Sequence, residues 1–439
     1  MQPTPTVSIA EMLRQIIILL TSAALSLQAL PPLNVQVQGQ LPRADGSDTR
    51  RPLRPLSFSP DGTFQVSIFE DLHFGENEEG PWGPEQDKLT VKVINEVLDK
   101  ESAGLVVLNG DLITGENTFQ HNSTAYINEM VAPMLERRLS WASTYGNHDY
   151  DVNISGALIL ERERRWRNSR TMSMVPGRDA GVSNYYLPVY PRKCCRRDCG
   201  SPELILWFFD SRGGNYFQEH RADGSAVPQP NWVDESVVRW FEETSAGLAA
   251  QYGRTIPSLA FVHIPTNASL TLQTEGGPGG GIDPNREPGI NDDYNLAQQG
   301  QGWCANGTAD GTCAYGGQDV PFMRAMAATQ GLIGVFSGHD HGDTWCHRWD
   351  GLVPGMAVAG TGAALCFGQH SGYGGYGDWV RGSRQVRLSL ETLRERKWEA
   401  ETWIRLETGN VVGAVTLNAT YGTDVYPATP NDKTYCTTC

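Results

Sequence analysis

Short apolar runs alternate with amphipathic stretches along the first third of the chain. FQVSIFED (64–71) and GLVVLNGD (104–111) have the length of strands, and the second is continuously apolar, as in a strand buried on both faces. The segment 87–101 between them has apolar residues on one side, which predicts a helix. A second helix is predicted over 124–137 and a third strand over 139–149. This alternation predicts a parallel sheet with right-handed crossovers.

The rest of the chain gives more strand signals and two more helices, over 232–252 and 319–329. Strands are predicted over 184–190, 203–211, 258–265, 331–341, 345–349, 355–360, 384–390, 402–407 and 411–417, the first two as a pair. A stretch rich in Gly, Asn and Asp, 266–318, has no periodicity and reads as an insertion. We predict one α/β domain over 63–425, with an arm or linker before it (30–62) and a tail after it (426–439).

Residue types that bind metal ions directly follow five of the apolar runs. In chain order they are Asp71 and His73; Asp111; Asn147, His148 and Asp149; His263; and His339 and His341. The carboxyl ends of parallel strands lie at one edge of a sheet, so these residues can converge there. Each alone could be an ordinary turn or cap residue. Five such groups, each at a strand end, argue against coincidence.

The set holds too many N and O ligands for one metal ion and fits two. Imidazole together with carboxylate suits Zn, Fe or Mn better than Ca or Mg. Two ions about 3.5–4 Å apart favour in-line displacement at phosphorus, where one activates a hydroxide and both bind phosphoryl oxygens. Their charge would exceed that of two carboxylates, so a phosphate dianion would be attracted locally.

These groups resemble the signature of the calcineurin-like metallophosphoesterase superfamily: D-x-H, G-D, G-N-H-D/E, H and G-H-x-H. All five blocks are present between Asp71 and His341. Segments 339–346 and 365–384 also resemble a secreted fungal branch related to purple acid phosphatases. The resemblance implies a four-layer α/β/β/α sandwich, with two mixed sheets and a dinuclear metal centre at the loop edge.

The resemblance also implies a role for each residue at the strand ends. Asp71, His73 and His341 would hold one metal ion, Asn147, His263 and His339 the other, and Asp111 would bridge them. His148 would assist the leaving-group oxygen as general acid or transition-state stabiliser, with Asp149 fixing its tautomer and orientation.

One departure from purple acid phosphatases concerns colour. Their Tyr ligand is missing here, since Asp111 is followed by Leu112, Ile113 and Thr114. We therefore expect a colourless centre of Mn, Zn or Fe(II), without a strong visible absorption band.

These features predict a phosphoesterase that hydrolyses phosphate monoesters of small molecules or phosphoproteins through two divalent metal ions. Two alternatives remain open. One is a phosphodiesterase acting on phospholipid headgroups or nucleotides, and the other is a non-catalytic, metal-stabilised binding protein on the same scaffold. The insertion 266–318 lies between the His263 and His339 blocks, so it reads either as a lid or specificity loop over the metal edge or as a surface decoration.

Net charge and the N-terminal segment bear on partners and compartment. The formal net charge of −15 argues against a broad basic surface that binds nucleic acid. Residues 1–29 read as a secretory signal peptide, with a single membrane anchor as the alternative. We expect a secreted protein or one in the lumen of an endomembrane compartment or vacuole, with no stable membrane span after cleavage.

Glycosylation motifs and cysteines agree with that route. N-x-S/T triplets begin at Asn122, Asn153, Asn267, Asn306 and Asn418. In an oxidising compartment the nine cysteines favour disulfides, with Cys304–Cys313, Cys346–Cys366 and Cys436–Cys439 as candidate pairs. A thiolate zinc site is the alternative, but no CxxC pair recurs with the spacing of a zinc ribbon.

Overall fold

The computed structural model describes residues 54–77, 79–191, 199–276, 280–293, 298–309 and 311–434. Everything described below belongs to the unit that spans residues 50–439. The predicted signal peptide and the candidate pair Cys436–Cys439 lie outside the described residues.

One mixed sheet has six strands in the order β15-β14-β13-β2-β3-β4. They are β2 (Thr63–Phe69), β3 (Leu105–Asn109), β4 (Trp141–Thr144), β13 (Gly382–Ser389), β14 (Ala400–Leu406) and β15 (Val411–Leu417). β2, β3 and β4 are parallel, as the alternation of strands and helices predicts, and β13 joins them antiparallel to β2.

A second mixed sheet has seven strands in the order β1-β5-β6-β9-β10-β12-β11. They are β1 (Leu56–Ser57), β5 (Tyr185–Tyr190), β6 (Leu204–Phe209), β9 (Ser258–Val262), β10 (Leu332–Ser337), β11 (Cys346–Gly351) and β12 (Gly360–Phe367). β6, β9, β10 and β12 are parallel neighbours. β5 pairs antiparallel with β6, which confirms the predicted pair. A separate ribbon joins β7 (Asn215–His220) to β8 (Ala226–Pro228).

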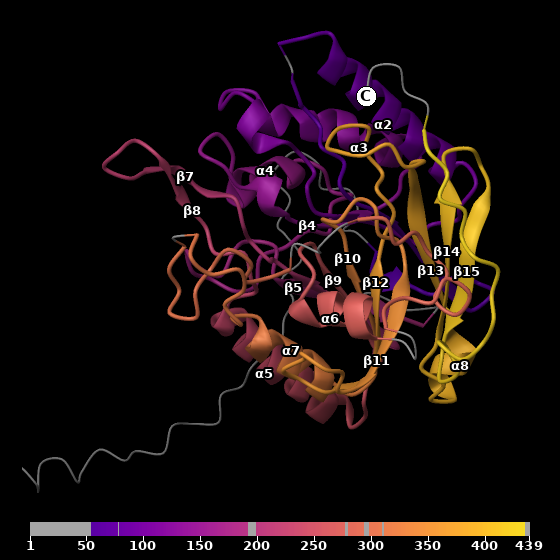
Figure 1. Ribbon diagram of the computed structural model, residues 1–439. Coiled ribbons are helices and arrows are strands. Elements are labelled where there is room, and N and C mark those ends of the chain that lie inside the picture. The colour runs from indigo at the N-terminus through magenta and orange to yellow at the C-terminus, as the bar shows by residue number, and fades with distance from the viewer. Residues whose placement is uncertain are drawn as a thin grey trace, which may run out of the picture. The chain divides into compact units, whose positions relative to one another are not determined.

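The helices form two groups (Figure 1). They are α2 (Trp82–Leu98), α3 (Ile127–Glu136) and α4 (Gly156–Glu163) in one, and α5 (Glu235–Tyr252), α6 (Asn267–Glu275) and α7 (Val320–Ala328) in the other, with a short α8 (Leu390–Arg394). In Figure 1, α2 lies beside α3, and α5 lies beside α7. Short 3-10 helices are η1 (Gly115–Asn117), η2 (Ser123–Tyr126) and η3 (Asn147–Asp149).

Both faces of β6 are buried, each in a different hydrophobic cluster. Leu204, Leu206 and Phe208 join a cluster that takes side chains from both sheets. The alternate residues of the strand pack instead with side chains of α5, α6 and α7. A third cluster joins β2, β3 and β4 to α2, α3 and α4. The two sheets therefore pack against each other, and the mixed α/β fold with two large mixed sheets is confirmed.

The structure differs from the predicted organisation at four places. β1 pairs with β5, and Trp379 bridges Lys433, so residues 54–62 and 426–434 include parts of the folded unit rather than only an arm and a tail. The insertion 266–318 begins with the helix α6, whose sequence shows no clear period. The predicted strand over 355–360 is wrong, because β12 begins at Gly360. Met356 and Val358 are buried beside helix side chains instead of in a strand.

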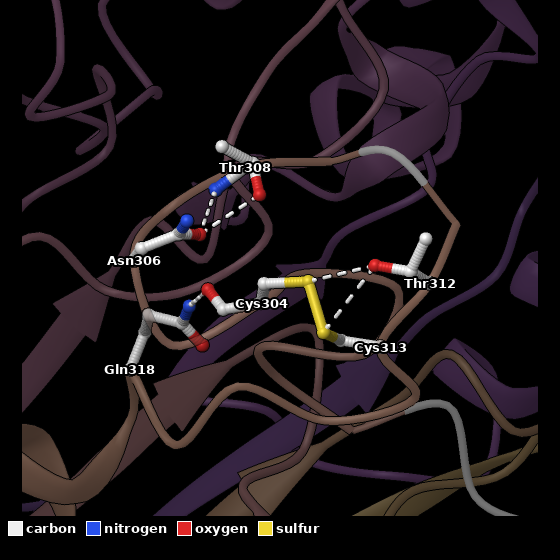
Figure 2. The surroundings of a disulfide bond; sticks show 6 residues. All are labelled: Cys304, Asn306, Thr308, Thr312, Cys313 and Gln318. Atoms are coloured by element: carbon white, nitrogen blue, oxygen red, sulfur yellow. Dashed lines mark hydrogen bonds between the residues drawn. A yellow bond between two sulfur atoms is a disulfide. The ribbon is translucent and has the colours of Figure 1, made fainter.

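Two of the three candidate disulfides are present. Cys304 bonds Cys313 inside the insertion (Figure 2), and Cys346 bonds Cys366 between β11 and β12. Within the part of the chain that the structure describes, no helix is both long enough and apolar enough to cross a membrane.

Candidate metal centre

The predicted ligand residues follow strands of both sheets. β2, β3 and β4 end just before Asp71, Asp111 and Asn147, while β9 and β10 end just before His263 and His339. We call the segments 70–73, 110–111, 146–149, 263 and 338–341 the strand-end loops. Backbone hydrogen bonds tie them together: the amide of Asp71 donates to the Gly110 carbonyl, and that of Gly338 donates to the His263 carbonyl. The edge where both sheets end therefore brings the groups together.

Four of these residues have left-handed backbone conformations. The φ angles are 53° at Asp71, 47° at His73, 47° at Asp111 and 77° at His339. This region is sparsely populated by residues other than Gly, and each such residue costs on the order of 1–3 kcal/mol. Because strain of this kind persists only where the surroundings enforce it, its concentration at one edge indicates a functional site.

The candidate ligand atoms fall into two groups. Asp71, His73 and His341 form one, and Asp111, His263 and His339 form the other, with the atoms of each group within 4.8 Å of one another. They contain the ligands that the resemblance implies for two metal ions except Asn147, and they place the bridging candidate Asp111 with the second group. Each group combines imidazole with carboxylate, the donor set expected for Zn, Fe or Mn.

Asp111 lies between the two groups. Its Oδ2 is 2.8 Å from Nε2 of His263 and 3.9 Å from Nε2 of His73. Its Oδ1 accepts a hydrogen bond of 2.9 Å from the backbone amide of His148. The carboxylate thus faces both groups from a fixed position, as a bridging ligand must.

Hydrogen bonds donated by Nδ1 orient the rings of His263 and His341 so that Nε2 faces inward. Nδ1 of His263 is 2.9 Å from the carbonyl oxygen of Asn109, and Nδ1 of His341 is 2.8 Å from that of Tyr376. A carbonyl only accepts, so Nδ1 carries the proton and Nε2 is left with a lone pair in the neutral ring. Contacts of this kind fix the tautomer of metal-binding histidines.

His73 is oriented in the same way by a side chain. Its Nδ1 is 3.0 Å from the hydroxyl of Thr114, and its Nε2 is 3.3 Å from Nε2 of His341. Two inward nitrogens at that distance, beside the Asp71 carboxylate, suit a shared positive ion.

Oδ1 of Asn147 is buried at the centre and has no hydrogen-bond partner among the described residues. Nε2 of His263, which is also buried, lies 2.8 Å from Oδ2 of Asp111. A buried polar atom without a partner is costly in a folded protein. Both atoms are the predicted ligand atoms of the second group, so the residues present fit a bound ion.

Neighbouring charges determine which of these groups hold protons. Burial alone would raise the pKa of Asp111, but His263 and His148 beside it lower that pKa well below the usual range. Burial would lower the pKa of His263, but Asp111 raises it to about 10. Burial and His148 lower the pKa of His73 to about 3. Without metal ions, the centre therefore contains a charged carboxylate, a protonated His263 and a neutral His73.

His148 lies beside the two groups but in neither of them, and its partner is Glu116. Nδ1 of His148 is 2.6 Å from Oε1 of Glu116, a residue of η1. Burial disfavours the charged ring, yet Asp111 and Glu116 raise the pKa of His148 to about 9. The ring is half-buried and lines the cavity above the metal groups, where it can donate a proton.

The expected contact between Asp149 and His148 is absent. The buried Asp149 carboxylate accepts hydrogen bonds from the backbone amides of Leu112, Ile113 and Gly146. Burial and the charge of Asp111 raise the pKa of Asp149 to about 8. This side chain holds two strand-end loops together, and the orienting role that the resemblance implied for it belongs by geometry to Glu116.

Two glycines permit the close approach of the loops. A Cβ at Gly110, where φ is 94°, would lie 2.4 Å from the His263 ring. A Cβ at Gly146 would lie 2.3 Å from Oδ1 of Asp111. Neither ligand could keep its place if these positions carried a side chain.

A cavity of about 500 Å³ opens above the metal groups. It is lined by His73, Glu76, Asp111, Thr114, Glu116, His148, Asp293, His339, Asp340, His341, Gly375 and Tyr376. Asp293 shows that the insertion reaches the site, as its position in the sequence suggests. No Lys or Arg is among the described lining residues, so the walls are acidic.

The profile of the calcineurin-like phosphoesterase family matches residues 71–343, more than half of the chain, and ends just beyond the last strand-end loop. The chain belongs to the calcineurin-like phosphoesterases.

Related proteins place this phosphoesterase near the purple acid phosphatases. It is 26% identical over 380 residues to a protein of Arabidopsis thaliana named probable inactive purple acid phosphatase 29. The alignment covers 81% of this chain and 85% of the relative. Phosphatase DCR2 of Saccharomyces cerevisiae is 25% identical over 371 residues, or 80% of this chain and 55% of that protein. A solved dimetal phosphatase from Danio rerio aligns with 81% of this chain and 98% of its own, at 12% identity and a TM-score of 0.45.

Sequence reasoning missed two contributors to the site of this calcineurin-like phosphoesterase. Glu116 lies five residues after Asp111, in a loop without a recognisable motif. Tyr376 stacks its ring on that of His341, with the centroids 3.9 Å apart, and its hydroxyl donates to Asp293. The only sequence feature that pointed to Tyr376 is its position in a Gly-rich stretch that follows the G-H-x-H motif at 338–341.

Proposed function

We propose that this chain is a phosphomonoesterase that works with two divalent metal ions. Asp71, His73 and His341 would hold one ion, and Asn147, His263 and His339 the other, with Asp111 between them. When bound, two such ions supply the positive charge that polarises the phosphoryl oxygens and the attacking water. The observation that carries the proposal is the buried Oδ1 of Asn147, which has no hydrogen-bond partner among the described residues, beside the two clusters of carboxylate and imidazole atoms.

The chain's own residues prepare the site for phosphate. Backbone conformation and Nδ1 contacts fix the ligand side chains before substrate arrives, so little reorganisation is needed on binding. Most of the ligand side chains are buried, which strengthens their electrostatic interactions with the phosphate.

His148 is the proposed proton donor to the leaving-group oxygen. Without metal ions the pKa of His148 is about 9, and the Glu116 carboxylate beside Nδ1 favours the protonated ring, which leaves Nε2 for the substrate. Departure of an alkoxide or phenoxide is easier when a proton reaches it in the transition state.

The acidic walls suggest a limit on the substrate. Glu76, Glu116, Asp293 and Asp340 line the cavity beside the ligand residues. A single phosphate group can bind the metal ions, but additional phosphates on the same molecule would face these carboxylates. The proposal is therefore a monoester with one phosphate, on a small molecule or a protein side chain, rather than a polyphosphate.

Two other functions remain as alternatives. A diesterase would use the same centre on phospholipid headgroups or nucleotides, and a binding protein would hold the metal ions without turnover. The word "inactive" in the name of the Arabidopsis relative is a statement about that protein, but it makes the non-catalytic alternative worth a direct test.

The test compares hydrolysis of p-nitrophenyl phosphate with that of its bis-ester by metal-replete protein. We expect faster hydrolysis of the monoester. Faster hydrolysis of the bis-ester would favour the diesterase. A protein that binds two ions per chain and hydrolyses neither compound would be the binding protein.

The compartment is also a proposal. Two disulfides and relatives among the purple acid phosphatases support a secreted protein or one in the lumen of an endomembrane compartment or vacuole. Recovery of the chain from the medium of a eukaryotic host, with its N-terminus beginning near residue 30, would support secretion. Retention in the cytosol with the first 29 residues intact would contradict it.

A further inference from the structure

Two of the five N-x-S/T triplets share one side-chain geometry. Oδ1 of Asn306 accepts hydrogen bonds from the amide (3.1 Å) and hydroxyl (2.8 Å) of Thr308, as Figure 2 shows. Oδ1 of Asn418 accepts from the amide and hydroxyl of Thr420, both at 3.0 Å. In each triplet the side-chain carbonyl oxygen of Asn therefore accepts hydrogen bonds from the Thr two positions later.

The amide nitrogen at these two positions is left for another partner. No described residue accepts a hydrogen bond from Nδ2 of Asn306 or Asn418. Asn306 and Thr308 are exposed, and Asn418 is half-buried beside the exposed Thr420. A substituent on Nδ2 would therefore extend into solvent, and Oδ1 would keep its hydrogen bonds because substitution leaves the carbonyl intact.

Two other triplets use their side chains in contacts within the fold. Nδ2 of Asn153 donates a hydrogen bond of 3.0 Å to the carbonyl of Thr118, and the hydroxyl of Ser155 caps the first turn of α4. Asn267 and Ser269 lie in the first turn of α6, with 9% and 5% of their surfaces exposed. A large group on Asn267 would prevent α6, which begins four residues after His263, from packing its buried side chains against the second sheet.

We propose that Asn306 and Asn418 carry N-linked glycans and that Asn153 and Asn267 do not. Nδ2 would form a bond to the anomeric carbon of an oligosaccharide carried on a lipid pyrophosphate. The bond from that carbon to the pyrophosphate breaks, the pyrophosphate leaves with the electron pair, and the amide loses one proton. The reaction precedes folding, so chains modified at Asn267 would be lost from the folded protein.

The two sites have different surroundings. Asn306 lies in the loop closed by Cys304 and Cys313 (Figure 2). The same part of the insertion is attached beside the metal edge, because Gln299 donates to the carbonyl of Ile264. Its glycan would shield the insertion from proteases. Asn418 shares the lining of a cavity of about 530 Å³ with the partly exposed Trp398, an apolar surface on which a first sugar can rest.

The experiment uses the full chain secreted from a eukaryotic host. The folded fraction is treated with an amidase that releases N-glycans in heavy-oxygen water, which converts each occupied Asn to a labelled Asp, and peptides are read by mass spectrometry. We expect label at Asn306 and Asn418 and none at Asn153 or Asn267. Absence of label at either of the first two, or label at Asn267 in folded protein, would overturn the proposal.

Matched variants separate occupancy from misfolding. Thr308→Ala and Thr420→Ala should each increase electrophoretic mobility by the mass of one glycan, and Thr308→Ser should restore the original mobility. Asn153→Gln should leave the mobility unchanged, and a shift in that variant would count against the proposal. None of these residues touches the metal centre, so metal-dependent hydrolysis reports the proposed function separately.

Discussion

The strand-end loops and the insertion 266–318 both border the cavity, but the chain holds them in different ways. The loops are fixed by the ends of two sheets and by strained backbone at Asp71, His73, Asp111 and His339. The insertion is held by separate contacts along its length, such as the hydrogen bond from the amide of Asp292 to the carbonyl of Gly342 and that from the side chain of Gln299 to the carbonyl of Ile264, and one disulfide closes a loop within it. Metal binding requires ligand positions accurate to fractions of an ångström, whereas a wall of the cavity tolerates variation. The comparison teaches that the chemistry belongs to the loops and that the insertion modifies access and charge.

The largest effect should come from the bridging position. Asp111→Asn removes the charge that both metal groups share, so we expect loss of at least one ion and a fall in kcat/KM on the order of 1,000-fold or more. Metal content by mass spectrometry and hydrolysis of p-nitrophenyl phosphate measure the two effects. Asp61→Asn, at an exposed turn, is the control. Full activity in Asp111→Asn would contradict the assignment of the strand-end loops as the metal-binding site.

His148→Ala should lower kcat about 10²–10⁴-fold, the usual contribution of a general acid, while both ions stay bound. The ring lies in neither metal group, so its loss leaves the ligands in place. The exposed His220 in the β7–β8 ribbon provides the control His220→Ala. If metal content fell together with kcat, His148 would be a ligand instead of a proton donor.

Metal affinity should rise with pH, by up to about tenfold per pH unit near neutrality. Without metal ions, the pKa of His263 is about 10, so the ring is protonated at pH 7 and must release that proton to bind an ion. Competition with a chromophoric chelator between pH 6 and 8 measures the slope. An affinity that does not change with pH would mean that His263 is not a ligand.

Glu116→Gln should lower kcat about tenfold at neutral pH and move the alkaline limb of the pH profile to lower pH. The Glu116 carboxylate raises the pKa of His148, and activity falls when the pH rises through that pKa. Without the negative charge of Glu116, the activity begins to fall at a lower pH. Glu116→Asp should restore part of the shift, and Glu85→Gln on the exposed side of α2 is the control. An unchanged alkaline limb would exclude Glu116 as the positioning residue.

The smallest effect on catalysis should follow removal of the insertion disulfide. Cys304→Ser with Cys313→Ser opens a loop of 9 residues and should lower stability by about 2–3 kcal/mol, with kcat changed less than about threefold. Thermal unfolding and hydrolysis are measured on the same sample. The buried pair Cys346–Cys366 is the comparison, and its removal should cost more stability. A larger loss of kcat at the insertion would make it part of the catalytic machinery.

The ligand residues could be predicted because their signal is local. Each follows an apolar run directly, and the parallel order of β2, β3 and β4 follows from the alternation of strands and helices. The same reasoning identified Asn147, whose amide oxygen has no hydrogen-bond partner among the residues that the structure describes.

The features that could not be predicted from the sequence depend on contacts between distant segments of the chain. Glu116 meets His148 across two loops, and no periodicity marks such a pair. Asp149 was assigned to the neighbouring ring, but backbone amides of another loop take its carboxylate. The apolar residues Met356 and Val358 suggested a strand because burial against helices leaves the same sequence signal as burial in a sheet.

One titration tests the central claim most directly: protein stripped of metal by a chelator is given increasing amounts of a divalent ion, Mn, Zn or Fe(II). Bound metal and hydrolysis of p-nitrophenyl phosphate are measured together. The account predicts that activity is absent at the start, rises with bound metal and saturates at two ions per chain. Hydrolysis without metal, or two bound ions without hydrolysis of either the monoester or its bis-ester, would contradict it.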